Sequence, residues 1–179
     1  FPAVSAGWVA SSEKFWEPIS KYINHFKIRG SYGLVGSDAF ASGAPHFLYQ
    51  NNIGIGSAHK FWTGLPTSEI SKQGPGFYVL AVQDAGWEHV KKFDIGFDMM
   101  LFNQLNITFD YFHDKRERIL MSRASWPSML GYWGSKPWSN IGEVENQGFE
   151  LSLNWTKQFG KDLTLDLRGN FTYNQNEYK

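Results

Sequence analysis

The sequence contains no cysteine among its 179 residues, which excludes a disulfide framework and any zinc site built on thiolates. It has no unbroken apolar run of about 18 residues, so it contains no transmembrane helix. It also lacks an excess of charge, because 17 Lys and Arg residues balance 17 Asp and Glu residues. This balance gives no reason to expect a nucleic-acid partner.

Motifs for metal, nucleotide or catalytic chemistry are missing too. The five histidines are scattered with no pair at ligand spacing, so we expect no metal site. No glycine-rich segment is followed by Lys-Ser or Lys-Thr, which argues against a nucleotide site, and we expect no cofactor. Glu143 and Glu145 share one strand face instead of converging across a substrate, as a catalytic carboxylate pair must. We therefore predict no catalytic residues and no enzyme activity.

We expect neither a signal peptide nor a complete protein. The first residues have no basic start and no apolar core long enough for a signal peptide. The chain does not begin with Met, and it ends on Tyr178 and Lys179 where a predicted strand finishes. These features predict a segment of a longer protein.

What the sequence does contain is an alternation of apolar and polar residues with period two. Such alternation indicates strands with one apolar and one polar face. Because the polar residues of one face lower the mean hydropathy of such strands, a mean hydropathy of -0.39 does not exclude a transmembrane β-barrel. The predicted strands form an antiparallel meander and cover residues 2–9, 26–34, 87–102, 105–118, 141–156 and 163–174.

The connections between these strands differ strongly in length. Residues 103–104 are predicted to form a tight two-residue turn, and residues 157–162 a short turn. Residues 36–86 are predicted to be a long irregular segment with a short β-like piece at 47–49, and residues 119–140 a second long loop. The long loops fall at one end of the sheet and the short turns at the other. We interpret the glycines of the first long segment as loop residues: Gly54, Gly56, Gly74 and Gly76.

This asymmetry is typical of outer-membrane barrels, which have short periplasmic turns and long extracellular loops. Strands of about ten residues or more can cross a bilayer at a tilt of about 45°. We therefore favour an all-β fold, an antiparallel meander forming part of a large transmembrane β-barrel. A soluble antiparallel sandwich also alternates and stays as the alternative. The aromatic residues near strand ends that suit interfacial girdles are Trp8, Trp87, Tyr111, Trp155 and Tyr173.

The polar strand faces have two interpretations. In a barrel they line a wet lumen, and in a sandwich they face solvent. The residues concerned are Asp94, Asp98, Thr108, Asp110, Glu150, Asn154, Asp166, Arg168 and Asn170.

Aromatic residues in the long loops are the candidates for ligand contact. A flat ring can stack on the apolar face of a sugar or on a peptide side chain. The same rings could instead pack the loops together or against a protein partner, because interfaces also favour Trp and Tyr. The candidate substrate-binding residues are Trp62, Phe77, Tyr78, Trp126, Tyr132, Trp133 and Trp138.

Several segments, in one order along the chain, resemble the barrel of SusC/RagA-type TonB-linked outer-membrane transporters. Residues 140–150, which read Asn-Ile-Gly-Glu-Val-Glu-Asn-Gln-Gly-Phe-Glu, carry the strongest resemblance. It covers nearly the whole chain except the segment from about residue 37 to residue 85. The other segments are residues 1–8, 27–36, 87–88, 92–98, 110–112, 115–116 and 119–120.

This resemblance implies that residues 1–179 are a partial TonB-dependent receptor β-barrel domain, about six strands of a barrel of about 22 strands. The plug domain and the remaining strands would lie outside this sequence. The implied activity is import of oligosaccharides (glycans) or peptides across the bacterial outer membrane.

The resemblance also implies the partners. They are a SusD-like surface lipoprotein, the TonB complex acting through the missing plug region, outer-membrane lipid, and an oligosaccharide or peptide cargo. We expect a homodimer of transporter–lipoprotein pairs and no nucleic acid. The alternative from the residues alone is a soluble or surface-attached β-sandwich that binds carbohydrate.

Overall fold

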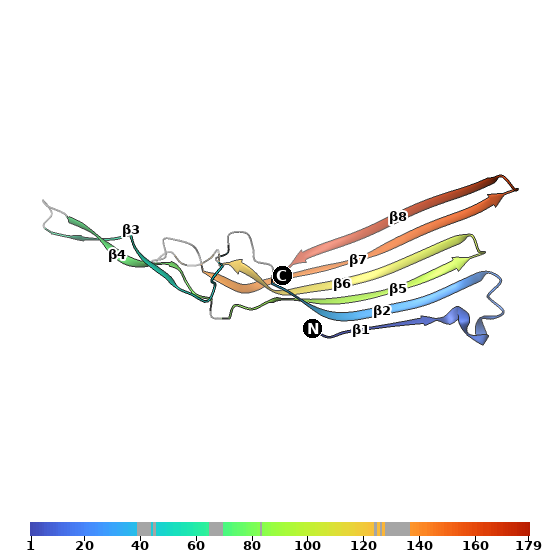
Figure 1. The fold of residues 1–179 in the computed structure, drawn as a ribbon, viewed down its shortest axis with the longest axis horizontal. Helices are drawn as coiled ribbons and strands as arrows, with labels where there is room; N and C mark the ends of the chain where they lie inside the picture. Colours follow the sequence, from blue (N-terminus) through green and yellow to red (C-terminus); the bar gives the residue numbers. More distant parts are fainter. Residues whose placement is uncertain are drawn as a thin grey trace. The chain divides into compact units, whose positions relative to one another are not determined.

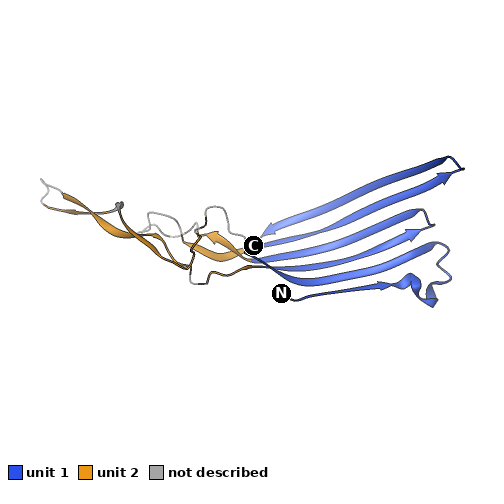
Figure 2. Cartoon of the chain, in the orientation of Figure 1, with its two compact units in different colours: residues 1–37, 89–117, 143–179 blue, residues 38–88, 118–142 orange. Residues whose placement is uncertain are grey.

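The computed structural model describes residues 1–38, 44, 46–64, 70–82, 84–123, 125, 127 and 137–179. The chain divides into two compact units, residues 1–37, 89–117 and 143–179, and residues 38–88 and 118–142 (Figure 2). Within the described residues, no helix has the length and apolar character needed to span a bilayer.

The first unit is built on a six-stranded antiparallel sheet in the order β1-β2-β5-β6-β7-β8 (Figure 1). This is the meander that the alternation predicted, and each predicted strand is present: β2, β6, β7 and β8 extend beyond the predicted bounds by several residues, whereas β1 and β5 are shorter by one or two. The strands are β1 (Ala3–Val9), β2 (Ile23–Ser37), β5 (Glu88–Leu101), β6 (Leu105–Ser122), β7 (Trp138–Phe159) and β8 (Leu163–Tyr178).

Short connections join these strands at one end. Two 3-10 helices, η1 (Ala10–Ser12) and η2 (Lys14–Trp16), lie between β1 and β2. Between β5 and β6 the two left-handed residues are Phe102 and Asn103, each with φ of 53°, and the Gln104 amide donates to the Leu101 carbonyl at 2.9 Å. The turn therefore starts one residue earlier than predicted. A positive φ is unusual for a bulky residue such as Phe, so sequence rules did not point to this position.

The segment predicted to be irregular, residues 36–86, contains a two-stranded antiparallel hairpin instead. It consists of β3 (Asn52–Thr63) and β4 (Ile70–Val79). The glycines interpreted as loop residues lie opposite one another in this ladder, Gly54 beside Gly76 and Gly56 beside Gly74. Glycine usually weakens a strand, which is why the pattern predicted a loop. The β-like piece predicted at residues 47–49 was wrong as well, since these residues enter a turn closed by the Gln50 amide on the Phe47 carbonyl.

The described residues hold very little apolar core. In the second unit, Leu48, Val82 and Leu120 form a small buried cluster, and Ala44 and Trp138 pack against it. On the six-stranded sheet, Leu153 and Leu165 stay 38% and 40% exposed. A sandwich would bury such residues between two facing sheets. The described residues of the first unit have no such interior, so this unit is a single-layer sheet and the sandwich alternative is not supported.

Candidate functional site

The first candidate surface is an apolar face that crosses the six-stranded sheet. In the register of β5 with β6, Phe97 lies opposite Phe109, and in that of β7 with β8, Phe149 lies opposite Tyr173. Because side chains alternate between faces, residues with odd numbers on β5 to β8 share this face. We call its apolar members within the first unit the apolar band: Phe93, Ile95, Phe97, Met99, Leu101, Leu105, Ile107, Phe109, Tyr111, Phe149, Leu151, Leu153, Trp155, Phe159, Leu163, Leu165, Leu167, Phe171 and Tyr173.

A row of aromatic rings runs across the strands within this face. Phe97 stacks on Phe109 with ring centroids 5.5 Å apart, and Phe109 stacks on Phe149 at 6.1 Å. Phe149 contacts Phe171 at 5.7 Å, while Phe26 of β2 contacts Phe97 at 6.0 Å. These centroid distances lie in the range of favourable aromatic pairs. The rings therefore stabilise the lateral order of the strands.

The second candidate surface is the opposite, polar face. Arg29 of β2 donates from Nη2 to Asp110 at 2.8 Å and from Nε to Asp98 at 3.3 Å. Beside this group lies an open cavity of about 490 Å³ whose lining includes Arg29, Asp110, Asp94 and Glu150. The second carboxylate oxygen of Asp110 is buried with no hydrogen-bond partner in the described part of the chain. This face matches the polar surface predicted from sequence and suits contact with water or with polar protein groups.

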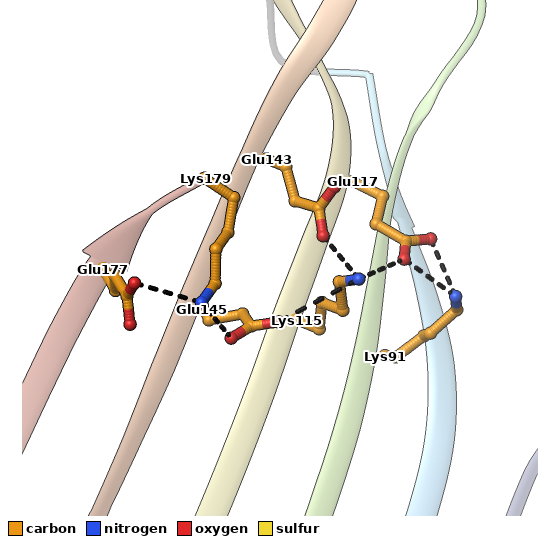
Figure 3. A network of polar contacts seen from close by, with 7 residues as sticks. All are labelled: Lys91, Lys115, Glu117, Glu143, Glu145, Glu177 and Lys179. Atoms are coloured by element: carbon orange, nitrogen blue, oxygen red, sulfur yellow. Dashed lines mark hydrogen bonds and ion pairs between the residues drawn. The ribbon is translucent and has the colours of Figure 1, made fainter.

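The third candidate surface is a charged row on the same face as the apolar band, two to six residues beyond it along each strand. Figure 3 shows its residues and their contacts. Lys115 of β6 forms ion pairs with Glu143 and, at 3.2 Å, with Glu117. Lys91 of β5 lies 2.8 Å from Glu117. Lys179 bridges Glu177 at 3.0 Å and Glu145 at 3.4 Å. The charged row consists of Lys91, Lys115, Glu117, Glu143, Glu145, Glu177 and Lys179.

These contacts favour the charged forms of Lys115 and Glu117. The pKa of Lys115 is raised above its ordinary value because its ammonium is hydrogen-bonded by Glu143 and Glu117. The pKa of Glu117 is lowered because its carboxylate accepts hydrogen bonds from Lys91 and Lys115. Both groups lie beyond the apolar band and stay ionised around neutral pH.

The predicted ligand-contact residues are not gathered into one site. Trp62 lies opposite Ser71 in the hairpin and is 65% exposed, whereas Phe77 lies opposite Ile53. Ser71 and Phe77 are six residues apart on β4, about 20 Å at about 3.3 Å per residue. Tyr78, on the same strand as Phe77, places its ring over Gly54.

The remaining candidates lie elsewhere. Trp138 is half-buried and packs against the small cluster of Leu48, Val82 and Leu120, which is a packing role. Trp126, Tyr132 and Trp133 lie outside the described residues.

Sequence reasoning missed both the aromatic row and the charged row. Each residue was visible as part of an alternating strand, but the rows join residues from different strands and depend on register. One signal was present. On β6 the odd-numbered residues are apolar up to Tyr111 and charged at Lys115 and Glu117, so the sequence alone shows that this face changes from apolar to charged.

Comparison with known proteins resolves the family. The family model described as TonB dependent receptor-like, beta-barrel matches residues 1–179. The chain belongs to this family. The prediction from sequence is thereby confirmed at the level of family and fold, because the all-β antiparallel sheet is the segment expected of such a barrel.

Individual relatives agree. The chain is 29% identical over 178 residues to the TonB-dependent receptor P39 of Formosa agariphila, covering 99% of this chain and 15% of that protein. It is 26% identical over 189 residues to the TonB-dependent receptor SusC of Bacteroides thetaiotaomicron, covering 99% of this chain and 17% of that protein. The chain thus spans under a fifth of the length of these curated relatives.

A solved structure shares the fold. The RagAB peptide importer in its open-open state superposes with a TM-score of 0.73 at 20% identity, covering 98% of this chain and 17% of that one. At this identity the match bears on the fold alone.

Proposed function

We propose that this chain is one part of the wall of an outer-membrane importer, with the apolar band against lipid and the polar face toward the lumen. The observation that carries the proposal is the apolar band, whose aromatic row is half-buried at Phe97, Phe109 and Phe149 and whose neighbours Leu153, Leu165, Leu167 and Phe171 are exposed. A water-soluble protein rarely exposes so continuous an apolar surface without a partner. In a barrel wall, hydrocarbon is that partner.

The dimensions of the band support this assignment. On β8 it runs from Leu163 to Tyr173, ten residue steps or about 33 Å along the strand at about 3.3 Å per residue. At a tilt of about 45° this length projects to about 23 Å, close to the apolar band of about 25 Å that outer-membrane barrels present. Tyr111 and Tyr173 end the band on β6 and β8, where interfacial aromatic residues are favoured.

The sheet also has the connectivity of a barrel wall. Strands β1 and β8 lie at its two edges, and a barrel closes by pairing such edges with further strands. We infer that residues 1–179 form one partial barrel domain of a larger barrel, of about 22 strands if it follows the family.

For the whole protein we propose import of oligosaccharides or peptides, powered by the TonB complex and assisted by a SusD-like lipoprotein in a dimer of transporter–lipoprotein pairs. The support is the family and the names of the relatives, one a SusC and one a peptide importer. No bond-making chemistry is proposed, and among the described residues no group of His, Cys, Asp and Glu is arranged to hold a metal ion. The exposed Trp62, Phe77 and Tyr78 are the proposed cargo contacts among the described residues.

Fractionation and uptake test the proposal in the whole receptor that carries this chain. We expect extraction from the outer membrane only with detergent, and gel migration that changes on heating. Shortening residues 37–85 should reduce uptake of the cargo, identified with defined oligosaccharides and peptides, while the receptor still assembles. Solubility in buffer without detergent would contradict the barrel, and undiminished uptake would contradict the cargo contacts.

A further inference from the structure

The side chain of Asn140 joins three segments of the second unit. Its Oδ1 accepts a hydrogen bond from the Gly86 amide at 3.2 Å, and its Nδ2 donates to the Gly86 carbonyl at 3.0 Å. The same Nδ2 donates to the Arg118 carbonyl at 2.8 Å. Asn140 belongs to β7, Arg118 to β6, and Gly86 lies two residues before β5. One side chain therefore ties the end of the long connection between β2 and β5 to the two strands that flank the next long connection.

Main-chain pairing does not make this link. The register of β5 with β6 runs from His89 with Glu117 to Leu101 with Leu105, so Gly86 lies outside it. Two residues that exchange both an N–H and a C=O bond form the hydrogen-bonded pair of an antiparallel ladder. The Asn140 side chain makes the same exchange with Gly86, because a side-chain amide carries one acceptor and two donors. It continues the pairing beyond the point where this ladder ends.

The backbone of Arg118 is unusual at this contact. Its φ is 62°, in the left-handed region that residues other than glycine adopt uncommonly. Its Nη2 donates to the Asp84 carbonyl at 3.4 Å, and a Cβ on Gly86 would meet that nitrogen at 2.6 Å. A backbone outlier of this kind is a reason to look for a function. Here it coincides with the residue whose carbonyl Asn140 binds.

The β3–β4 hairpin belongs to the same unit. The chain on either side of it is joined by the Val82 amide, which donates to the Leu48 carbonyl at 2.7 Å. Both residues pack with Leu120 of β6 in the small buried cluster. Gly86 follows Val82 by four residues, so the contact with Asn140 lies where the chain passes from the hairpin to β5.

We propose that Asn140 is a positioning residue for cargo binding, which holds the hairpin in one orientation relative to the ends of β6 and β7. This inference rests on the proposed function, because the hairpin carries the proposed cargo contacts. Gly86 and Arg118 are exposed, so water can replace the hydrogen bonds lost in a variant, and their net contribution to stability is modest. The effect of Asn140 is therefore expected on the orientation of the hairpin and not on assembly of the barrel.

The same substitution at two asparagines tests this role. Asn140→Asp keeps the size and the acceptor but sets a carboxylate oxygen against two carbonyls, so two of the three hydrogen bonds are lost. Asn51→Asp is the matched control, because Asn51 only accepts, through Oδ1 from the Ala81 amide at 2.7 Å, and aspartate keeps that bond. Nitroxide labels on Ser71→Cys of the hairpin and Ser122→Cys of β6 give their distance distribution by pulsed EPR in the whole receptor in bilayers. We expect a broader distribution for Asn140→Asp and an unchanged one for Asn51→Asp.

Cargo affinity gives the functional readout. The probe is the defined oligosaccharide or peptide that the parent receptor takes up. If the hairpin keeps the binding orientation about a third of the time in Asn140→Asp, the apparent affinity falls about threefold. The amount of receptor in the outer membrane and its heat-dependent gel migration should stay unchanged. Asn140→Ala, which removes the bonds without adding a charge, replaces Asn140→Asp if that variant does not assemble.

The outcomes separate this inference from the proposed function. An unchanged distance distribution in the Asn140 variant, or equal broadening in Asn51→Asp, would overturn the positioning role. So would a broader distribution with unchanged cargo affinity in a receptor whose uptake falls when residues 37–85 are shortened. Undiminished uptake after that shortening would instead contradict the cargo contacts of the hairpin.

Discussion

The six-stranded sheet and the β3–β4 hairpin both have two strand faces, but they differ in how apolar and polar residues are distributed between those faces. The sheet separates its residues by face, with aromatic rings on one side and the Arg29, Asp98 and Asp110 group on the other. The hairpin alternates little and sets Gly54 against Gly76 in its ladder. The difference teaches that strict alternation marks the part that the proposed barrel would place between lipid and lumen, whereas the hairpin shows little such alternation.

The largest effect is expected from a charge placed on the apolar face of a sheet strand. Leu153→Lys places a charge in the apolar band and should cost about 2–4 kcal/mol if the band faces lipid. Ser152→Lys, one residue away on the polar face, should cost much less. The check is the free energy of unfolding of the whole receptor in bilayers. Similar losses for the two variants would contradict the separation of faces.

Replacing glycines by alanine compares how tightly the sheet and the hairpin are packed, and should give the next largest effect. A Cβ on Gly148 of β7 would collide with the backbone carbonyl of Tyr173 on β8, so Gly148→Ala should cost as much as about 3 kcal/mol by forcing two strands apart. A Cβ on Gly54 of the hairpin would meet the Tyr78 ring at 2.6 Å, which can move aside. Gly54→Ala should therefore cost clearly less in the same unfolding measurement. Equal costs would show that the hairpin is packed as tightly as the sheet.

The aromatic row offers a smaller effect. Phe109→Ala removes ring contacts with Phe97 and Phe149 and should cost about 2 kcal/mol, since each aromatic pair contributes about 1 kcal/mol. Phe61 of the hairpin is 52% exposed, so Phe61→Ala should change stability by less than about 0.5 kcal/mol. Thermal unfolding of both variants in bilayers measures the two losses of stability. A larger loss for Phe61→Ala than for Phe109→Ala would contradict this prediction.

The smallest effect is expected on the polar face. Arg29→Ala breaks two ion pairs whose side chains are about a third exposed or less, so the loss should be about 1 kcal/mol after solvent screening. Adding Asp98→Asn and Asp110→Asn should restore part of it by removing the unpaired charges. A matched control is Arg168→Ala on β8, which should be nearly neutral. Failure of the double Asn change to rescue stability would mean that Arg29 acts through packing and not through charge.

The sheet could be predicted from sequence because its two faces impose the period-two pattern directly, as in the alternation around Phe97 and Phe109. The hairpin could not, because its paired glycines carry no apolar or polar signal and glycine indicates a loop. The turn at Phe102 was displaced by one residue because a left-handed Phe is rare. The charged row escaped prediction because Lys115 and Glu143 meet only once the register of different strands is known.

The central claim is that alternate residues of one strand face lipid and lumen. An oxygen-accessibility scan with single nitroxide labels at residues 149–155 of β7, in the whole receptor in bilayers, tests it most directly. The account predicts oxygen accessibility that oscillates with period two and peaks at the odd positions Phe149, Leu151, Leu153 and Trp155. A flat profile, or peaks at the even positions, would contradict it.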